Sequence, residues 1–301
     1  MILEKNFTKK FEGNFSESVN LSNYSWFNLG GDAEFFFKAN NKSQLLDFLT
    51  EVKKKKFKTT ILGAGSNTLI RDNGVKGVVI KLGKGFAFTK ILDENILELG
   101  AATLDRKVAN FAKDNNIGNL EFLSCIPGSI GGAVIMNSGC YENDISKVLI
   151  SIRAINLKNL SEIEIKKEDI NFLYRGTNLP KDLIIISAKL KGKIRKKYEI
   201  EKIQSELIKR KKLSQPSQIK TCGSTFKNVS ENQKAWMLIK EAGCENLREG
   251  DAYISQKHCN FFVNNGNAKS SDIENLINKV KQKVKEKTGV NLELEINIIG
   301  E

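Results

Sequence analysis

The sequence lacks the features that mark membrane-inserted and exported proteins. Its longest purely aliphatic run covers only residues 183–186, far short of the roughly 20 apolar residues that span a bilayer. The first residues, from Met1 to Phe7, contain no apolar segment of the kind found in secretory signals. We therefore expect neither membrane insertion nor export by a signal peptide, and we expect the protein to be cytoplasmic.

Histidine and paired cysteines are also scarce. The single histidine, His258, leaves no second imidazole for a histidine-based metal site, and any Ser-His-Asp triad would have to be built around it. None of the cysteines forms a C-x-x-C pair, and their odd number is typical of reduced thiols. They are Cys125, Cys140, Cys222, Cys244 and Cys259. We expect no bound metal.

Arginine is rare relative to lysine. The formal net charge is +13, yet only 7 of the 48 basic residues are arginines. Nucleic-acid recognition favours the planar, bidentate guanidinium group, so we expect no nucleic-acid partner. The positive field would still attract anionic small molecules. The lysine-rich runs at residues 53–56 and 209–212 follow helical patterns, where cations suit the helix dipole, and are expected to be solvated surface.

Patterns for helices and strands alternate along the chain, and only 3 prolines interrupt them. Helical periodicity covers residues 43–56, 103–115 and 273–284, the last behind a predicted Ser271-x-x-Glu274 capping box. Strand patterns cover residues 59–62, 77–82, 149–157, 183–190 and 292–299. The class is therefore mixed α and β. The length of 301 residues suits two domains, and a lysine-rich helix over residues 198–213 leads to Gln215-Pro216, where we place the passage between them.

Two glycine-dense stretches are the first candidates for chemistry. One is Leu62-Gly-Ala-Gly-Ser-Asn67, and the other runs from Ile126 to Gly139. Thr68 stands where the third glycine of a dinucleotide fingerprint would be, and no P-loop motif exists. Backbone N–H groups of both stretches would suit a pyrophosphate. The alternatives are an ordinary glycine-rich strand turn and, for Gly131 and Gly132, a helix start packed tightly against a sheet.

The second half of the chain carries candidate side chains. Ser224 lies in a glycine turn close to Lys227 and Asn228, but taken alone it is typical of a turn or cap residue. Glu293 and Glu295 share one face of the predicted last strand because side chains alternate along a strand. Taken alone, this pair is typical of exposed surface carboxylates.

Taken together, these motifs resemble one family closely. Six motifs occur in the order seen in UDP-N-acetylenolpyruvoylglucosamine reductases, the flavin enzymes of peptidoglycan synthesis. They are Leu62-Gly-Ala-Gly-Ser-Asn67; Ile126-Pro-Gly-Ser-Ile-Gly-Gly-Ala133 with Met136-Asn137; Tyr174-Arg175; Gly223-Ser-Thr-Phe-Lys-Asn228; Ser255-Gln-Lys-His258 with Asn260-Phe261; and Leu292-Glu-Leu-Glu295. The resemblance extends from about residue 24 to residue 301.

The resemblance implies an α+β fold with an FAD-binding domain of the vanillyl-alcohol-oxidase (PCMH) type and a smaller α+β substrate-binding domain. The first would cover residues 1–196, with its core at about 24–192, and the second residues 197–301, whose last strand would return Glu295 to the active site. NADPH would reduce non-covalent FAD, and UDP-N-acetylglucosamine enolpyruvate would become UDP-N-acetylmuramate. A monomer is expected.

The resemblance also assigns residues. Ser224 would donate a proton to carbon 2 of the enolpyruvyl group, while Arg175 and Glu295 would be the other catalytic residues. Tyr174, Lys227, Asn228 and Lys257 would bind the substrate. The cofactor contacts would be Gly63, Ala64, Gly65, Ser66, Asn67, Leu69, Ile126, Pro127, Gly128, Ser129, Gly131, Gly132, Ala133, Asn137 and Gly139.

Some positions depart from the family pattern. Only 49 positions separate Arg175 from Ser224 (224 − 175 = 49), which resembles the shorter variant that lacks a substrate-covering loop. Asn28, Thr177 and Val229 replace the usual Arg, Ser and Pro, and Glu142 stands where glycine is usual.

Two alternatives stay open. One is another flavin oxidoreductase of the same fold with a covalent flavin, for which Cys125 or Cys140 would supply the link. The other is a basic RNA-binding or scaffold protein, although most of the 17 phenylalanines sit in apolar runs or beside acidic residues instead of forming basic aromatic platforms.

Overall fold

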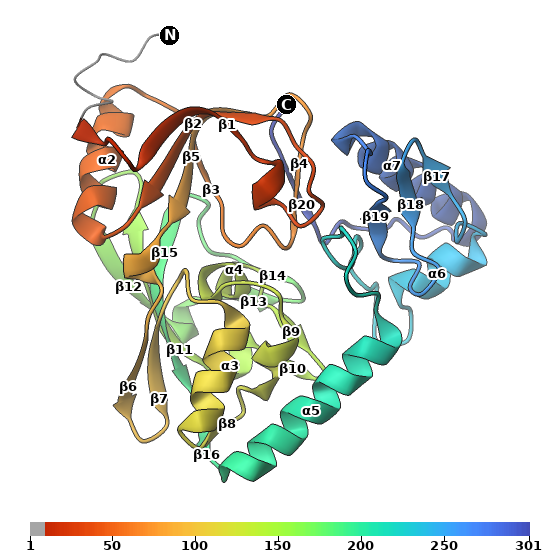
Figure 1. Ribbon diagram of the computed structural model, residues 1–301. Helices are drawn as coiled ribbons and strands as arrows, with labels where there is room; N and C mark the ends of the chain where they lie inside the picture. The colour runs from red at the N-terminus through yellow and green to blue at the C-terminus, as the bar shows by residue number, and fades with distance from the viewer. Residues whose placement is uncertain (1–9) are drawn as a thin grey trace. The chain divides into compact units, whose positions relative to one another are not determined.

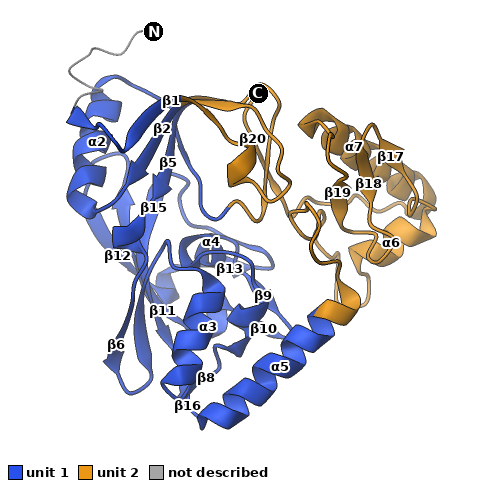
Figure 2. Ribbon diagram, in the orientation of Figure 1, with its two compact units in different colours: residues 1–17, 35–64, 77–211 blue, residues 18–34, 65–76, 212–301 orange. Residues whose placement is uncertain are grey.

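The computed structural model describes residues 10–301, which divide by their contacts into two units (Figure 2). Unit 1 comprises residues 10–17, 35–64 and 77–211, and unit 2 comprises residues 18–34, 65–76 and 212–301. Each unit is thus assembled from three separate stretches of chain. The division predicted by resemblance at residue 196 follows the linear sequence, whereas two short N-terminal stretches belong with the C-terminal part in these units.

A phenylalanine-rich core joins helix α2 (Lys42–Lys54) to the first sheet, most of whose residues belong to unit 1. The strand order is β1 (Phe15–Asn20), β2 (Asp32–Ala39), β5 (Val75–Leu82) and β3 (Thr59–Ile61). Helix α2 buries Leu45, Phe48, Leu49 and Val52 at helical spacing, and the Phe48 ring stacks on Phe37 with centroids 3.7 Å apart. The helix predicted at residues 43–56 is confirmed.

The second sheet of unit 1 is antiparallel throughout. Its order is β12 (Glu162–Lys166), β11 (Leu149–Asn156), β15 (Leu183–Lys191), β7 (Ile96–Gly100) and β6 (Thr89–Asp93). Strand β15 is almost wholly buried, which accounts for its aliphatic run. Helix α4 (Ile130–Ile135) packs against β7 and β15, and α3 (Asp105–Asp114) packs against the 3₁₀ helix η3 (Glu121–Cys125). These elements share one apolar core.

Unit 2 packs two helices against a small sheet. Helix α7 (Ser270–Thr288) contacts α6 (Ala235–Glu241) and all strands of the sheet β17 (Arg248–Glu249), β18 (Ala252–Ile254) and β19 (Phe262–Asn264). Strand β20 (Asn297–Ile299) pairs in parallel with β4 (Thr68–Ile70). Phe27, Leu29 and Leu69 join this core from the N-terminal stretches. The long helix α5 (Lys197–Ser214) leads from unit 1 into unit 2 along the chain (Figure 1).

Short elements complete the structure. The 3₁₀ helices are η1 (Ser22–Tyr24), η2 (Lys84–Phe86), η4 (Ile145–Lys147) and η5 (Lys167–Asp169). Three short antiparallel pairs join β8 (Ile117–Gly118) to β16 (Lys193–Ile194), β9 (Gly139–Cys140) to β10 (Asn143–Asp144), and β13 (Phe172–Leu173) to β14 (Gly176–Thr177). Over the described residues, none of the helices is both long and apolar enough to traverse a bilayer.

The capping box predicted at Ser271 and Glu274 is wrong. The N-cap of helix α7 is Lys269, two residues before the predicted Ser271. The Asp72 carboxylate accepts hydrogen bonds from the N–H groups of Ser270 (2.7 Å) and Ser271 (3.0 Å). Asp72 therefore caps this helix from about 200 positions away. Glu274 instead pairs with Arg71, whose Nε and Nη2 donate to its two carboxylate oxygens at 2.9 and 3.0 Å.

The last predicted strand is shorter than expected. Strand β20 covers only Asn297–Ile299, and Glu295 lies in a bend before it. Glu293 and Glu295 therefore do not share the face of one strand, and Glu293 is exposed whereas Glu295 is half-buried. The solvated surface expected for the basic run 209–212 is also wrong for Lys211, whose Nζ donates to the carbonyl of Cys125 at 2.6 Å.

Candidate active site

The first glycine-rich stretch is a loop between β3 and β4. A helix does not follow it, which agrees with the absence of a dinucleotide fingerprint. Gly65 has a φ of +69°, and a Cβ atom there would lie 1.8 Å from the carbonyl oxygen of Tyr24. The Trp26 N–H donates to the Gly65 carbonyl at 3.0 Å. Glycine is therefore required at this position by backbone conformation and by packing.

The second glycine-rich stretch contains glycines of two kinds. A Cβ on Gly131 would lie 3.1 Å from Ala101 Cβ, and one on Gly128 would lie 2.6 Å from a carboxyl oxygen of Asp105. Close packing explains these two. A Cβ on Gly132 would meet nothing closer than Ser129 Oγ, at 3.9 Å. The alternative of tight helix packing thus accounts for Gly131 but not for Gly132.

The two stretches come together around Ser129. A Cβ on Gly63 would lie 3.4 Å from Ser129 Oγ, the same oxygen atom that lies 3.9 Å from a Cβ on Gly132. Within residues 10–301, the backbone N–H groups of Gly63, Ala64, Ser129 and Gly132 have no protein acceptor. Open space beside several available N–H groups fits a phosphate-bearing ligand. We call Gly63, Ala64, Ser129 and Gly132 the backbone cradle.

Asn137 supports a neighbouring hairpin. Its Nδ2 donates to the Leu173 carbonyl at 3.1 Å, and its Oδ1 accepts from the Ser146 N–H at 3.0 Å. The side chain of this predicted cofactor residue is therefore engaged with the protein.

Arg175 lies at the tip of that hairpin. Strands β13 and β14 are joined by Tyr174 and Arg175, and Arg175 has a φ of +58°. Its Nη2 donates to the carbonyl of Gly139 at 2.8 Å, while its guanidinium lies 4.9 Å from the centre of the half-exposed Tyr174 ring. These contacts hold a permanent positive charge beside the second glycine-rich stretch in unit 1.

Ser224 and Glu295 lie on neighbouring segments in unit 2. Ser224 follows Gly223, whose φ is +83°, and forms an antiparallel bridge with Phe261. On the other side, the Glu295 N–H donates to the Thr225 carbonyl at 2.9 Å. The Asn67 Nδ2 also donates to the Glu295 carbonyl at 2.9 Å. The first glycine-rich loop thus helps to fix the backbone at Glu295, close to the Ser224 segment.

The predicted substrate-binding residues Lys227 and Asn228 continue the Ser224 segment. The Lys227 ammonium lies 3.8 Å from a carboxylate oxygen of Glu293. The Asn228 Oδ1 accepts from the N–H of Ala235, the first residue of α6, at 3.1 Å. The carboxylate of Glu293 is therefore paired with Lys227, a predicted substrate-binding residue. Asn228 stabilises the start of α6.

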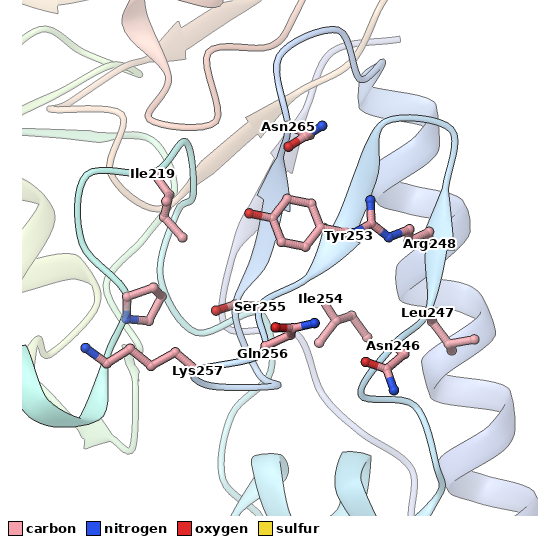
Figure 3. A pocket seen from close by; sticks show the side chains of 11 residues that line it. Ile219, Asn246, Leu247, Arg248, Tyr253, Ile254, Ser255, Gln256, Lys257 and Asn265 are labelled. Carbon is pink, nitrogen blue, oxygen red and sulfur yellow. The ribbon is translucent and has the colours of Figure 1, made fainter.

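Lys257 borders a cavity of about 480 Å³ in unit 2. Its Nζ donates to the carbonyl of Lys212 at 2.6 Å. Strand β18 and the loops around it supply most of the wall, and side chains from eleven residues line the cavity (Figure 3): Pro216, Ile219, Asn246, Leu247, Arg248, Tyr253, Ile254, Ser255, Gln256, Lys257 and Asn265. The mixture of amide, hydroxyl and cationic groups suits a polar, anionic ligand.

Sequence reasoning missed three supporting residues. Asn260 donates from Nδ2 to the Phe226 carbonyl at 2.8 Å and accepts from its N–H at 3.0 Å, so it holds the Ser224 segment. The Thr225 hydroxyl is fully buried and has no hydrogen-bond partner among the described residues. In unit 1, burial raises the pKa of Asp105 well above its usual value, and the Gly128 N–H opposes this shift. Of these three, only Asn260 could have been found from the sequence, because it follows His258 in one of the six family motifs.

His258 has a structural setting. Burial lowers its pKa, its Nδ1 accepts from the Asn260 N–H at 3.3 Å, and its ring packs edge-on against Phe261.

Comparison with known proteins identifies the family. Residues 215–299 match the model of the C-terminal domain of UDP-N-acetylenolpyruvoylglucosamine reductase, and residues 33–159 match an FAD binding domain. The UDP-N-acetylenolpyruvoylglucosamine reductase of Pelagibacter ubique is 46% identical over 297 residues, which cover 97% of this chain and 98% of the relative. That of Wolbachia pipientis wMel is 41% identical over 97% of both chains. The chain belongs to the UDP-N-acetylenolpyruvoylglucosamine reductase family.

A solved structure agrees with this family assignment. The crystal structure of the Thermus caldophilus UDP-N-acetylenolpyruvylglucosamine reductase has a TM-score of 0.81 and 32% identity, covering 94% of this chain and 98% of that one. The predicted α+β class with a PCMH-type FAD-binding domain is confirmed. The protein is a flavin-dependent oxidoreductase, and the backbone cradle fits FAD because it offers N–H groups beside open space. Family membership favours this enzyme over the RNA-binding alternative.

Proposed function

We propose that this protein reduces UDP-N-acetylglucosamine enolpyruvate to UDP-N-acetylmuramate, with NADPH as the reductant, during synthesis of peptidoglycan precursors. The observation that carries the proposal is the hydrogen bond from Asn67 to the Glu295 carbonyl. It joins a loop typical of a flavin site to the segment pair that holds Ser224 and Glu295. The backbone segments that carry Asn67, Ser224 and Glu295 are thus hydrogen-bonded to one another within unit 2, which supports the proposal.

FAD would be held through the backbone cradle, whose N–H groups suit its pyrophosphate. Bound FAD supplies hydride transfer from NADPH to carbon 3 of the enolpyruvyl group. The protein must then protonate carbon 2 and stabilise the negative charge that develops on the substrate. Ser224, Arg175 and Glu295 are our candidates for these tasks.

Ser224 would donate the proton to carbon 2. A serine hydroxyl is a weak acid, but it can protonate a strongly basic carbanion when it is held within hydrogen-bond reach. The rigid surroundings of Ser224 support this role, because its segment is hydrogen-bonded on both sides. Glu295 would stabilise the enol form.

Arg175 would bind the substrate carboxylate as that group gains enolate charge. A guanidinium keeps its charge at all physiological pH values and binds a carboxylate through two N–H groups. Its contact with the Gly139 carbonyl supports a preorganised position, so little reorganisation is required during the reaction.

Lys227, Asn228 and Lys257 would bind the UDP part of the substrate, and Tyr174 would contribute a further contact. The cationic and polar lining of the cavity beside Lys257 supports this assignment. We also propose that the protein acts in the cytoplasm as a monomer without a nucleic-acid partner.

The first test is an absorbance spectrum of the purified protein followed by anaerobic additions. Bound FAD should give a flavin band that NADPH bleaches and that only the enolpyruvyl UDP-sugar restores. Bleaching without restoration by this substrate would overturn the substrate assignment while leaving the flavin assignment intact. Acid precipitation should release the flavin into solution. Flavin retained in the precipitate would instead favour the covalent alternative.

A further inference from the structure

Two thiols flank the second glycine-rich stretch. Cys125 ends η3, directly before Ile126, and Cys140 lies in β9, directly after Gly139. η3 and β9 pack against each other in unit 1. Fourteen residues separate the two cysteines in the sequence, yet the packing of η3 against β9 brings them together, and each thiol shifts the pKa of the other. The protein therefore holds a reduced thiol pair at the two ends of a predicted cofactor segment.

The surroundings distinguish the two sulfur atoms. The Cys140 Sγ donates to the Phe122 carbonyl at 3.4 Å. The Cys125 Sγ lies 3.8 Å from the Ser124 hydroxyl, and only 6% of Cys125 is exposed. Cys140 is the more exposed of the two. Cys125 is therefore accessible only to a very small reagent.

Positive charges face this pair from three elements. Lys211 of α5 donates to the Cys125 carbonyl, Arg106 of α3 acts electrostatically on Cys125, and Arg175 acts on Cys140. The interaction with Cys140, with help from Ser124, Lys211 and Arg106, lowers the pKa of Cys125 to about 6 against the effect of burial. The interaction with Cys125 and burial raise the pKa of Cys140.

The remaining thiols differ from Cys125. Burial raises the pKa of Cys222 and of Cys259 to about 11, and it also raises that of Cys244. The thiolate is the nucleophilic form, and among the five cysteines only Cys125 combines a lowered pKa with a second cysteine on a segment packed against its own. A low-pKa cysteine next to a resolving cysteine is the arrangement typical of redox-sensitive sites.

We propose that Cys125 and Cys140 form a peroxide-oxidised thiol pair that closes reversibly to a disulfide. The Cys125 thiolate attacks one oxygen of hydrogen peroxide, the O–O bond breaks, and hydroxide leaves, which gives a sulfenic acid at Cys125. Cys140 then loses its proton and attacks the Cys125 sulfur. The S–S bond forms, the S–O bond breaks, and hydroxide leaves as water after taking up a proton. In total, two thiols and one hydrogen peroxide give one disulfide and two waters.

Closure requires the two sulfur atoms to move toward each other. The sulfur atoms must approach to about 2.05 Å, and the Cys140 contact with the Phe122 carbonyl must break. The resulting ring encloses residues 126–139, which include Ser129 and Gly132 of the backbone cradle. The last of these residues is Gly139, whose carbonyl accepts a hydrogen bond from Arg175.

The test follows the mass of one peptide and does not depend on flavin chemistry. Trypsin leaves Cys125 and Cys140 together in residues 114–147, because no lysine or arginine lies between residues 114 and 146. The full-length, FAD-saturated protein is treated with hydrogen peroxide, quenched with catalase, and alkylated after denaturation. The peptide should become two hydrogens lighter and lose both alkylation sites, and dithiothreitol should reverse the change.

Cys222, Cys244 and Cys259 are controls in the same sample. The pair should be oxidised at least roughly tenfold faster than these three thiols at pH 7, because a larger fraction of Cys125 is thiolate. Oxidation of all five cysteines at equal rates, or a peptide that keeps both alkylatable thiols, would overturn the proposal.

Single variants separate the two roles. In Cys140→Ser, dimedone should trap the sulfenic acid at Cys125, whereas in Cys125→Ser the remaining Cys140 should be oxidised no faster than Cys244. Lys211→Gln should slow formation of the disulfide by about fivefold because a nearby positive charge is lost, whereas Lys209→Gln, at an exposed position of the same helix, should not. Dimedone capture at Cys140 in place of Cys125 would refute the assigned order. If a variant does not fold, the proposal is tested by the oxidation rates of the pair and of the three control thiols in the wild-type protein.

Discussion

Units 1 and 2 carry their predicted site residues on different kinds of structure. In unit 1 the backbone cradle offers main-chain N–H groups, and its glycines matter because they lack a side chain. In unit 2 the Ser224 segment and Glu295 offer functional groups on a backbone that is fixed on both sides. Side chains added at the unit 1 glycines should therefore weaken ligand binding. Removal of functional groups from unit 2 should instead slow turnover.

Ser224→Ala should have the largest effect. Loss of the proton donor should lower kcat by roughly 10³-fold, while FAD stays bound and is still reduced by NADPH. Stopped-flow absorbance would measure flavin reduction and reoxidation separately. Ser230→Ala, at an exposed position of the same loop, is the control and should leave both rates unchanged. Normal reoxidation in Ser224→Ala would refute the proton-donor role.

Gly132→Val should have the largest effect on cofactor binding. Its Cβ would meet only Ser129 Oγ at 3.9 Å, so the fold should tolerate it, but the added atoms would fill the space beside the backbone cradle. We expect FAD affinity to fall by about 100-fold, or about 2.7 kcal/mol, with little change in Tm of the flavin-free protein. Flavin fluorescence titration measures the affinity.

Gly65→Ala is the matched contrast to Gly132→Val. Its Cβ would overlap the Tyr24 carbonyl oxygen, so the flavin-free protein itself should lose about 3 kcal/mol of stability. Equal losses of stability in both variants would abolish the distinction between packing and ligand-facing glycines.

Asp105→Asn should stabilise unit 1, because burial keeps the Asp105 carboxyl protonated. With a raised folded-state pKa, its stabilising contribution is fully present below the unfolded pKa and is lost as the pH rises through the folded value. The variant should therefore be more stable than the wild type at pH 8, by about 1–2 kcal/mol, with a smaller gain at pH 4. Chemical denaturation at the two pH values tests this sign.

Asp72→Ala should show the opposite pH dependence in unit 2. Burial opposes the shift, yet the Ser271 and Ser270 N–H groups lower the pKa of Asp72. Its stabilising contribution is therefore present above the unfolded pKa and disappears as the pH falls through the folded value. The variant should lose about 1 kcal/mol at pH 7, and wild type and variant should converge in acid.

Glu142→Gly should have the smallest effect. Tyr141 and Glu142 form the two-residue turn between β9 and β10, with φ values of +50° and +68°. This conformation favours glycine. We expect a gain of about 0.5 kcal/mol in unfolding free energy. A loss of stability would show that the Glu142 side chain has a compensating contact.

Local patterns predicted most helices and several strands, because α2, α3, α7, β11 and β15 bury apolar side chains at regular spacing. They failed where distant residues decide. Asp72 caps α7 in place of the predicted capping box. The hydrogen bond from the Glu295 N–H to the Thr225 carbonyl stabilises the bend before β20. Lys211 looked like a solvated cation because its sequence neighbours are basic, and only tertiary packing brings it to Cys125.

The candidate site was only partly readable from residue patterns. Glycine density predicted a phosphate-binding region, but Ser224 alone was typical of a turn, and its role came from resemblance to a family. Asn260 supports the Ser224 segment through hydrogen bonds to Phe226 that no local pattern encodes.

The assembly of unit 2 from three stretches of chain constrains how the protein is made. Its core combines Phe27 and Leu69 with side chains as late as Ile296. During translation, at about 5–20 residues per second, the early stretches leave the ribosome well before their partners exist. Unit 1, complete at residue 211, can acquire its core first. Unit 2 must wait for the last residues, so a stalled or truncated chain would display Phe27 and Leu69 as exposed apolar surface for chaperones and proteases.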